Sequence, residues 1–282
     1  MIVTYRGSVN RWECDENDHL NVRFFVQRHW QTLQAGLETL GVSISAAQLS
    51  TLHIRFLAEA RIATPLTGKF GVVTDSRGGT TVIFTQLCHS VTGQCLSSAL
   101  HDVRLQLDHV PEETECTIDS DLGPRGIPET HSAFADLPYA DLAAHNFQLI
   151  GKGIISGQEV TPDGSLCVHH YMGRLSDSMP HLWINLFGGT SGLDSGQGGA
   201  VLEYRMGFHR FAQLGTSYEV WSGLSRAGRK VQQFTHLMFD AGSKQLILDA
   251  QAVGLRMDLE SRKSVDLPDD VYAQMKSKVL LP

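Results

Sequence analysis

The chain has 282 residues, 42% of them hydrophobic and 19% charged, which suits one large domain or two domains of about 140 residues. Its formal net charge of −7 argues against nucleic acid or an anionic membrane as a partner. The five cysteines, an odd number with no Cys-x-x-Cys pair, indicate free thiols in a reducing compartment. Because no signal-peptide pattern and no apolar run of roughly 20 residues occurs, we expect a cytoplasmic protein that makes no membrane contact.

The first distinctive segment, residues 15–21, reads Asp-Glu-Asn-Asp-His-Leu-Asn and stands directly before a predicted helix from Val22 to Leu40. Apolar residues recur in that stretch at steps of three and four, which is typical of a helix with one buried face. A helix N-terminus offers unpaired backbone N–H groups and the positive end of the helix dipole. A carboxylate placed beside such donors is suited to attack on a polarised carbonyl group.

The pattern Asp-x-Asn-x-His-Leu-Asn, followed by a helix and then Leu40-Gly41, resembles the hotdog-fold thioesterases. It is similar to the 4-hydroxybenzoyl-CoA thioesterase group, and closer to the Asp-x-Asn-x-His-x-Asn pattern of acyl-ACP and carnitine/betaine-type thioesterases. The match covers roughly the first forty residues. Asp18 departs from it, because many relatives have Gly there, and Asp is a second-best residue for a left-handed turn.

The resemblance implies roles for the residues of this motif. Asp15 would attack the thioester carbonyl to form an anhydride, or act as general base on a water. Asn17 and His19 would position water or substrate, although His19 could equally be a buried, hydrogen-bonded histidine. Asn21 stands where a helix N-cap is expected, and the cap and the site could coincide. We expect the oxyanion contact at the N–H groups of residues 21–24.

Further along the first half, Glu59 follows a predicted strand at residues 53–57. Relatives often carry an acid here, so Glu59 is a further candidate site residue, with a surface acid as the alternative. Alternation of apolar and polar residues predicts a half-buried strand around Val103, Leu105 and Leu107. Gly78-Gly79 marks a hairpin turn between two such strands.

The two halves of the chain can be aligned with each other. Ahead of the helix the offset is 146 residues, and beyond it the offset is 150. The matched pairs include Glu13 with Glu159, Arg28 with Arg174, Arg55 with Arg205, Phe84-Thr85 with Phe234-Thr235 and Leu105 with Leu255. Prolines and acidic residues from Pro111 to about His145 indicate a connection between the halves. A single unduplicated domain is the alternative.

The second half lacks the motif. Thr161, Asp163, Ser165 and Cys167 stand at the places of Asp15, Asn17, His19 and Asn21. No acid replaces Asp15, and Pro180 interrupts the second predicted helix. The sequence therefore predicts one active site and one decayed site, with the second half forming walls of an acyl tunnel. The glycine-rich stretch 188–199 fits neither a P-loop nor a dinucleotide fingerprint.

Together the pattern and the resemblance predict an α+β double hotdog, with two antiparallel sheets each wrapped around a long central helix. Its parts are a first domain at 1–125, a linker at 126–144 and a second domain at 145–282. The implied activity is that of an acyl-thioester hydrolase of fatty acid metabolism, acting on acyl-CoA or acyl-ACP. The alternatives are a hotdog hydratase or dehydratase and a non-catalytic acyl-thioester-binding protein. No cofactor or metal is expected, since no zinc motif occurs among the thirteen histidines, and such chains could form a homo-oligomer.

Overall fold

The computed structural model describes residues 1–73, 80–187, 197–258 and 260–281. The predicted turn at Gly78-Gly79 and most of the glycine-rich stretch lie outside these residues. Contacts divide the chain into two compact units. Unit 1 is Met1–Arg125 with Ser165–Gly173, and unit 2 is Gly126–Gly164 with Arg174–Pro282. No helix among the described residues is long and apolar enough to cross a membrane.

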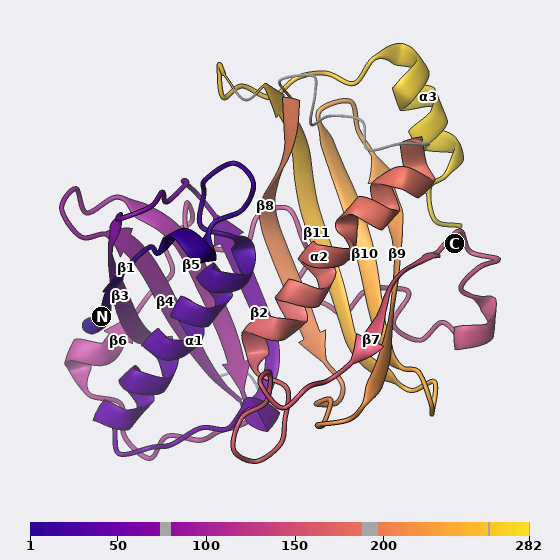
Figure 1. Cartoon of the computed structure of the whole chain (residues 1–282). Helices are drawn as coiled ribbons and strands as arrows, with labels where there is room; N and C mark the ends of the chain where they lie inside the picture. Colours follow the sequence, from indigo (N-terminus) through magenta and orange to yellow (C-terminus); the bar gives the residue numbers. More distant parts are fainter. Residues whose placement is uncertain (74–79, 188–196, 259, 282) are drawn as a thin grey trace. The chain divides into compact units, whose positions relative to one another are not determined.

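Unit 1 is an antiparallel sheet with one long helix across a face (Figure 1). Its strands follow the spatial order β1-β3-β4-β5-β2, and the two-residue β6 pairs parallel to β3. The elements are β1 (Ile2–Ser8), α1 (Val22–Thr39), β2 (Leu49–Phe56), β3 (Pro65–Val73), β4 (Thr81–His89), β5 (Cys95–Val103) and β6 (Glu115–Cys116). This is an α+β arrangement.

Helix α1 covers the range that the apolar periodicity predicts, within one residue. Its buried positions recur on one side, which faces the sheet. Close approach of helix and sheet depends on two glycines. A Cβ on Gly36 would lie 2.2 Å from the Phe70 ring, and one on Gly68 would lie 2.2 Å from Thr32 Oγ1. These glycines therefore let the helix backbone and β3 pack against each other.

Unit 2 repeats this plan. Its strands follow the order β8-β11-β10-β9-β7, and the part of α2 from Arg174 onward runs across one face (Figure 1). Trp183 of α2 packs edge-to-face on Phe234 of the sheet, with ring centroids 5.4 Å apart. The elements are β7 (Gln148–Ile154), α2 (Val168–Phe187), β8 (Gln197–Phe208), β9 (Ser217–Ala227), β10 (Val231–Asp240), β11 (Leu246–Asp258) and α3 (Asp269–Ser277).

The repeat extends from the sequence to the strand pairing. When β7 to β11 are matched with β1 to β5 in chain order, the strands of the two units follow the same spatial order. The irregularity in β1 between Val3 and Tyr5 recurs in β7 between Leu149 and Gly151, at the 146-residue offset. A bulge kept at the same place indicates that both halves preserve the same local twist.

The predicted strand around Val103 to Leu107 is wrong beyond its first residue. Strand β5 ends at Val103, which pairs with Leu49 at the start of β2 and Thr81 at the start of β4. Among the residues that the structure describes, no strand pairs with residues 104–107, so their alternation forms no ladder. The matching residues of β11 remain in a strand to Asp258, because β8 extends to Gln197 beside them.

Segment 126–147, most of it predicted as the linker, packs against the sheet of unit 2. Leu142 and Phe147 join Leu237, Phe239 and Leu280 in one buried cluster. The C-terminal helix α3 was not predicted from the sequence. It is nine residues long, and its only buried residue is Met275, so its periodicity is weak.

Candidate functional site

Asp15 closes a tight turn that leads into α1. Its carboxylate oxygen Oδ1 accepts hydrogen bonds from the N–H groups of Asn17, at 2.9 Å, and His19, at 3.1 Å. The backbone N–H of Asp15 donates to the His19 carbonyl, and that of Asp18 donates to the Asp15 carbonyl. Asp18 takes the left-handed conformation, with φ of 59°. The backbone N–H groups of the turn, rather than other side chains, therefore orient the Asp15 carboxylate.

His19 and Glu59 come together from distant parts of unit 1. Residues 19 and 61 form an isolated antiparallel bridge, and the Leu20 N–H donates to the Ala60 carbonyl at 2.8 Å. This pairing brings Glu59 Oε2 to 3.1 Å from His19 Nε2. His19 is buried while Glu59 is exposed. The structure thus places the predicted acid beside the predicted histidine, although their catalytic roles stay predictions.

Asn21 is the N-cap of α1. Its side-chain oxygen accepts the Arg23 N–H at 3.0 Å, and its own N–H donates to the Glu13 carbonyl at 2.9 Å. The Phe24 N–H donates to the Asn21 carbonyl. Of the four N–H groups expected to serve an oxyanion, three are therefore engaged. Val22 N–H is the one for which the described residues supply no acceptor.

Asn17 lies half-buried in the turn, where its backbone N–H supports Asp15. Cys14, immediately before Asp15, is a free thiol. Burial raises the pKa of Cys14, and the charges of Asp15, Asp18 and Glu13 raise it further. A thiol with a raised pKa is a poor nucleophile at neutral pH, so the local electrostatics favour a carboxylate as the reactive group.

A buried ion pair beneath the turn was not predicted as part of the site. The Glu13 carboxylate pairs with the Arg28 guanidinium of α1, and its other oxygen accepts from the Asn10 N–H at 2.9 Å. The Arg28 guanidinium lies over the Tyr5 ring, 5.6 Å from its centroid. The pair joins the segment just before the turn that carries Asp15 to the second helical turn of α1. Its only sequence signal was the repeat, which matched Glu13 and Arg28 with Glu159 and Arg174.

The second half keeps the turn without its chemistry. Gly164 stands at the place of Asp18 with φ of 81°, and its N–H donates to the Thr161 carbonyl at 2.8 Å. Glu159 and Arg174 form the matching ion pair. Thr161, at the place of Asp15, donates its hydroxyl to Asp163. The scaffold is therefore duplicated, whereas the acid that would react is present only in the first copy.

A second polar cluster lies in the core of unit 1. His29 of α1 contacts the hydroxyls of Thr85 and Ser97, both at 2.7 Å, and Thr85 contacts His101 at 3.0 Å. Burial lowers the pKa of His101 to about 3 and holds that of His29 well below its usual value. Both imidazoles are therefore neutral near pH 7 and serve as hydrogen-bonding core groups.

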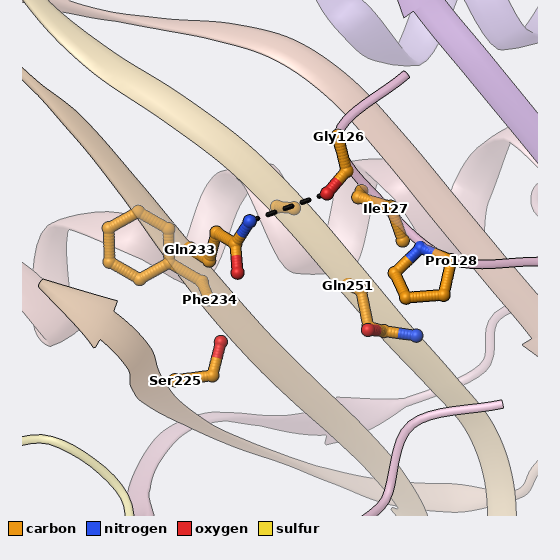
Figure 2. Close-up of a pocket in the computed structure, with 8 residues that line it drawn as sticks. Gly126, Ile127, Pro128, Ser225, Gln233, Phe234 and Gln251 are labelled. Atoms are coloured by element: carbon orange, nitrogen blue, oxygen red, sulfur yellow. Dashed lines mark hydrogen bonds between the residues drawn. The ribbon is translucent and has the colours of Figure 1, made fainter. Parts of the chain in front are cut away.

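A small hollow lies in unit 2 (Figure 2). None of the five predicted site residues lines it. The side chain of Gln233 crosses it to donate to the Gly126 carbonyl at 3.3 Å. It has room for about one water molecule, so it offers no room for an acyl chain. It is lined by Gly126, Ile127, Pro128, Ser225, Gln233, Phe234, Gln251 and Ala252.

No protein-family model matches the sequence, and comparison with the curated proteins finds no match. Solved structures do match the fold. An acyl-ACP thioesterase from Bacteroides thetaiotaomicron superposes with a TM-score of 0.60 at 12% identity, covering 89% of this chain and 96% of that one. The 12:0-ACP thioesterase from Umbellularia californica gives 0.60 at 10% identity, covering 90% and 96%. The tesB protein MAP1729c of Mycobacterium avium subs paratuberculosis gives 0.54 at 12% identity, covering 89% and 92%. The resemblance of the first forty residues to hotdog-fold thioesterases is therefore confirmed at the level of the fold, along nearly the whole chain.

Proposed function

We propose that this protein hydrolyses acyl thioesters, with Asp15 as the reactive carboxylate. The observation that carries the proposal is the turn at the N-terminus of α1. There Asp15 Oδ1 is held by two backbone N–H groups, and the adjacent His19 is paired with Glu59. The oriented carboxylate can act as a base. The positive end of the helix dipole beside it can stabilise the negative charge that develops on the thioester oxygen.

Two routes use this geometry. As general base, Asp15 takes a proton from a water whose oxygen bonds to the thioester carbon. The C–S bond then breaks, and the thiol leaves with a proton. As nucleophile, a carboxylate oxygen of Asp15 bonds to that carbon and the C–S bond breaks, which releases a thiolate. Water then hydrolyses the anhydride, which restores the Asp15 carboxylate, and a proton from that water neutralises the thiolate. Single turnovers in ¹⁸O-labelled water distinguish the routes, because only the anhydride route can leave label in the Asp15 carboxylate.

The other site residues would position the reacting groups. The Glu59 carboxylate orients the His19 imidazole, and the exposed side of this pair faces solvent, where substrate could approach. The Asn21 cap organises the first turn of α1 and leaves Val22 N–H as the donor for a developing oxyanion. Asn17 would align the attacking water or the substrate from within the turn.

We further propose that each unit is a hotdog domain, its sheet wrapped around its helix, so that the chain is a tandem double hotdog. The repeated strand order and the fold comparisons support this architecture. The matched solved structures include thioesterases described as acyl-ACP enzymes, which supports acyl-ACP beside acyl-CoA as substrate. The net charge of −7 favours acyl-CoA, because an acidic carrier protein would be repelled.

The test is free-thiol release from a panel of acyl-CoA and acyl-ACP substrates. Asp15→Asn should lower kcat/KM by on the order of 100-fold or more while leaving the fold intact, since it removes the base or nucleophile. Asp163→Asn is the matched control, because Asp163 lies in the duplicate turn, where Thr161 stands at the place of Asp15. This variant should keep activity within about threefold, far below the loss from removing a catalytic group.

A folded Asp15→Asn protein that keeps more than about a third of wild-type kcat/KM would contradict the assignment, since such a residue contributes 10²–10⁴-fold. If the wild type changes an enoyl thioester without releasing thiol, it is a hydratase. If it binds the thioester and changes nothing, it is a binding protein.

A further inference from the structure

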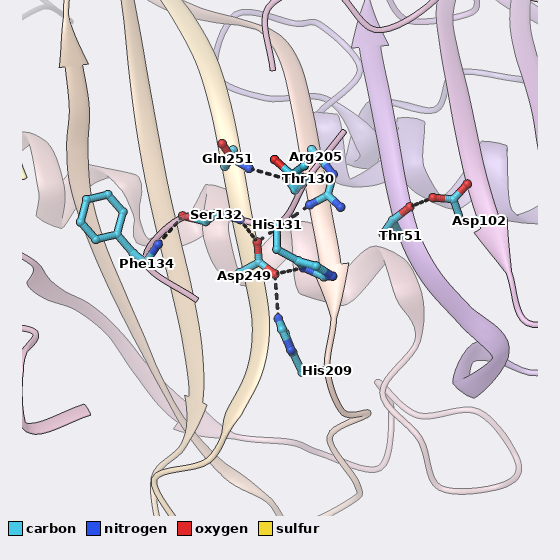
Figure 3. Close-up of polar contacts among 10 residues, drawn as sticks. All are labelled: Thr51, Asp102, Thr130, His131, Ser132, Phe134, Arg205, His209, Asp249 and Gln251. Carbon is cyan, nitrogen blue, oxygen red and sulfur yellow. Dashed lines mark hydrogen bonds and ion pairs between the residues drawn. The ribbon is translucent and has the colours of Figure 1, made fainter. Parts of the chain in front are cut away.

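Two histidine side chains from separate segments of unit 2 converge on one buried carboxylate (Figure 3). Asp249 of β11 is fully buried. Its oxygen Oδ1 lies 2.8 Å from His131 Nδ1 and 2.7 Å from His209 Nε2. His131 belongs to the segment that packs on the sheet of unit 2, and His209 directly follows β8. In sequence they lie 118 and 40 residues from Asp249.

We propose that His131, His209 and Asp249 form a binding site for a transition-metal dication of the Zn²⁺ class. Two imidazole nitrogens and one carboxylate oxygen are a donor set that suits Zn²⁺, whereas Mg²⁺ and Ca²⁺ prefer sites built from oxygen alone. The three ligand atoms all lie within 4.8 Å of one another. In a tetrahedral site with bonds of about 2.0–2.1 Å, ligand atoms stand roughly 3.4 Å apart. Small rotations of the two imidazoles therefore admit the ion.

The manner of convergence favours a metal over hydrogen bonding alone. Both imidazole nitrogens approach the same carboxylate oxygen, Oδ1. The other oxygen, Oδ2, is held by the Ser132 N–H at 3.0 Å and faces the Arg205 guanidinium at 4.0 Å. These contacts to Oδ2 fix the orientation of the carboxylate, as hydrogen bonds from neighbouring groups do for the ligands of metal ions. Burial raises the pKa of Asp249, but hydrogen bonds from His209, the Ser132 N–H and His131 hold it below its usual value.

Access and charge set the character of the site. The side chains of His131 and His209 are 52% and 32% exposed, so an ion could enter from solvent and would keep a water in its fourth position. The positive charge of Arg205 opposes a dication, so we expect weaker binding than in a closed site with four protein ligands. Because His131 lies in the packed segment and the other two ligands lie at the sheet, the ion would tie that segment to the sheet.

The experiment is a titration of the whole protein with ZnCl₂, followed by calorimetry, and with CoCl₂, followed by its absorption spectrum. The wild type should bind one ion per chain at this site. The Co²⁺ spectrum should lack the intense sulfur charge-transfer band that binding to any of the five cysteines would produce. Thermal unfolding should shift to higher temperature when Zn²⁺ is added, because the ion binds only the folded state.

His131→Gln and His209→Gln are the informative variants, because Gln can still donate a hydrogen bond to Asp249 but is a poor metal ligand. Each should weaken binding at least tenfold and abolish the zinc-dependent thermal shift, without lowering the melting temperature in the absence of metal. His181→Gln, on the exposed side of α2, is the matched control and should bind as the wild type does.

Three results would overturn the proposal. One is a wild type that takes up neither ion saturably. Another is a double variant, His131→Gln with His209→Gln, that binds Zn²⁺ as tightly as the wild type. The third is a Co²⁺ complex with the sulfur band, which would place the ion at cysteine. None of these readouts depends on thioester hydrolysis, so they test the metal site separately from the proposed activity.

Discussion

At the scale of single residues, the turn before α1 shows how one backbone angle is met by two different side chains. Asp18 and Gly164 occupy matching places and both have positive φ, 59° and 81°. Gly reaches this region at no steric cost, whereas Asp tolerates it because its short polar side chain can form local hydrogen bonds. The departure from the thioesterase pattern at Asp18 therefore leaves the shape of the turn intact.

Asp18→Gly should change stability by less than about 1 kcal/mol. Relief of the left-handed conformation is offset by the greater freedom of Gly in the unfolded chain. In the second copy of the turn, Gly164→Ala should cost about 1–2 kcal/mol, because the Ala Cβ clashes in the left-handed conformation and its side chain forms no local hydrogen bond. Urea unfolding of both variants measures the difference. Equal destabilisation by the two changes would show that the turns are not equivalent.

At the scale of elements, α1 and α2 are each joined to the turn ahead of them by a glutamate and an arginine 15 residues apart. Burial differs between the copies. The side chains of Glu13 and Arg28 are 4% and 12% exposed, against 13% and 24% for Glu159 and Arg174. When one member of a less solvated ion pair is removed, the remaining charge is left more costly, since water cannot reach it to compensate.

Glu13→Gln should therefore lower the free energy of unfolding by roughly 3 kcal/mol, because it leaves Arg28 as a poorly compensated buried charge. Glu159→Gln should cost roughly 1–2 kcal/mol, between the values for exposed and buried pairs. Chemical unfolding curves of the two variants, recorded side by side, give the comparison. A larger loss from Glu159→Gln would contradict this ranking. The Glu13 variant should also lose hydrolytic activity, because the pair supports the turn that carries Asp15.

At the scale of the whole molecule, buried histidines in both units make stability depend on pH. Burial lowers the pKa of His101 in unit 1 and of His236 in unit 2 to about 3. His236 is held between the Tyr204 hydroxyl, at 2.9 Å, and the Ser222 hydroxyl, at 2.6 Å. These imidazoles are neutral in the folded protein, whereas the unfolded chain takes up protons below about pH 6.5.

The stabilisation from these histidines is fully present above pH 6.5 and decreases as the pH falls toward 3, because protons then favour the unfolded state. Each group should contribute a slope of about 1.4 kcal/mol per pH unit, which is roughly 2 kcal/mol lost by pH 5. The window from pH 6.5 to 5 avoids the carboxylates with lowered pKa, Glu219 and Asp249, which titrate lower.

Denaturant unfolding at several pH values in that window is the measurement. His236→Gln should lower the slope of unfolding free energy against pH by about 1.4 kcal/mol per pH unit, the contribution of one proton. The exposed His181→Gln should leave this slope unchanged. A wild-type stability that is constant from pH 7 to 5 would show that these histidines are protonated in the folded state.

Local physics explains what the sequence alone determined. The bounds of α1 follow from apolar spacing and from Asn21, whose side chain caps the helix in any tertiary setting. The turn at residues 15–19 follows from short-range hydrogen bonds of Asp15, and the repeat is visible because both halves keep their residues in register. Each of these features depends on residues close together in the chain.

Tertiary structure alone decided the rest, because it depends on residues far apart in the sequence. Strand β5 ends at Val103, opposite the first residues of its neighbours β2 and β4, so the alternation beyond it predicted a strand that has no partner among the described residues. Glu59 reaches His19 through a bridge that no local pattern encodes. His131, His209 and Asp249 meet only when a packed segment, a strand end and a strand centre are brought together by the sheet of unit 2. Sequence spacing carries information about neighbours along the chain, whereas these contacts arise from strand register and packing.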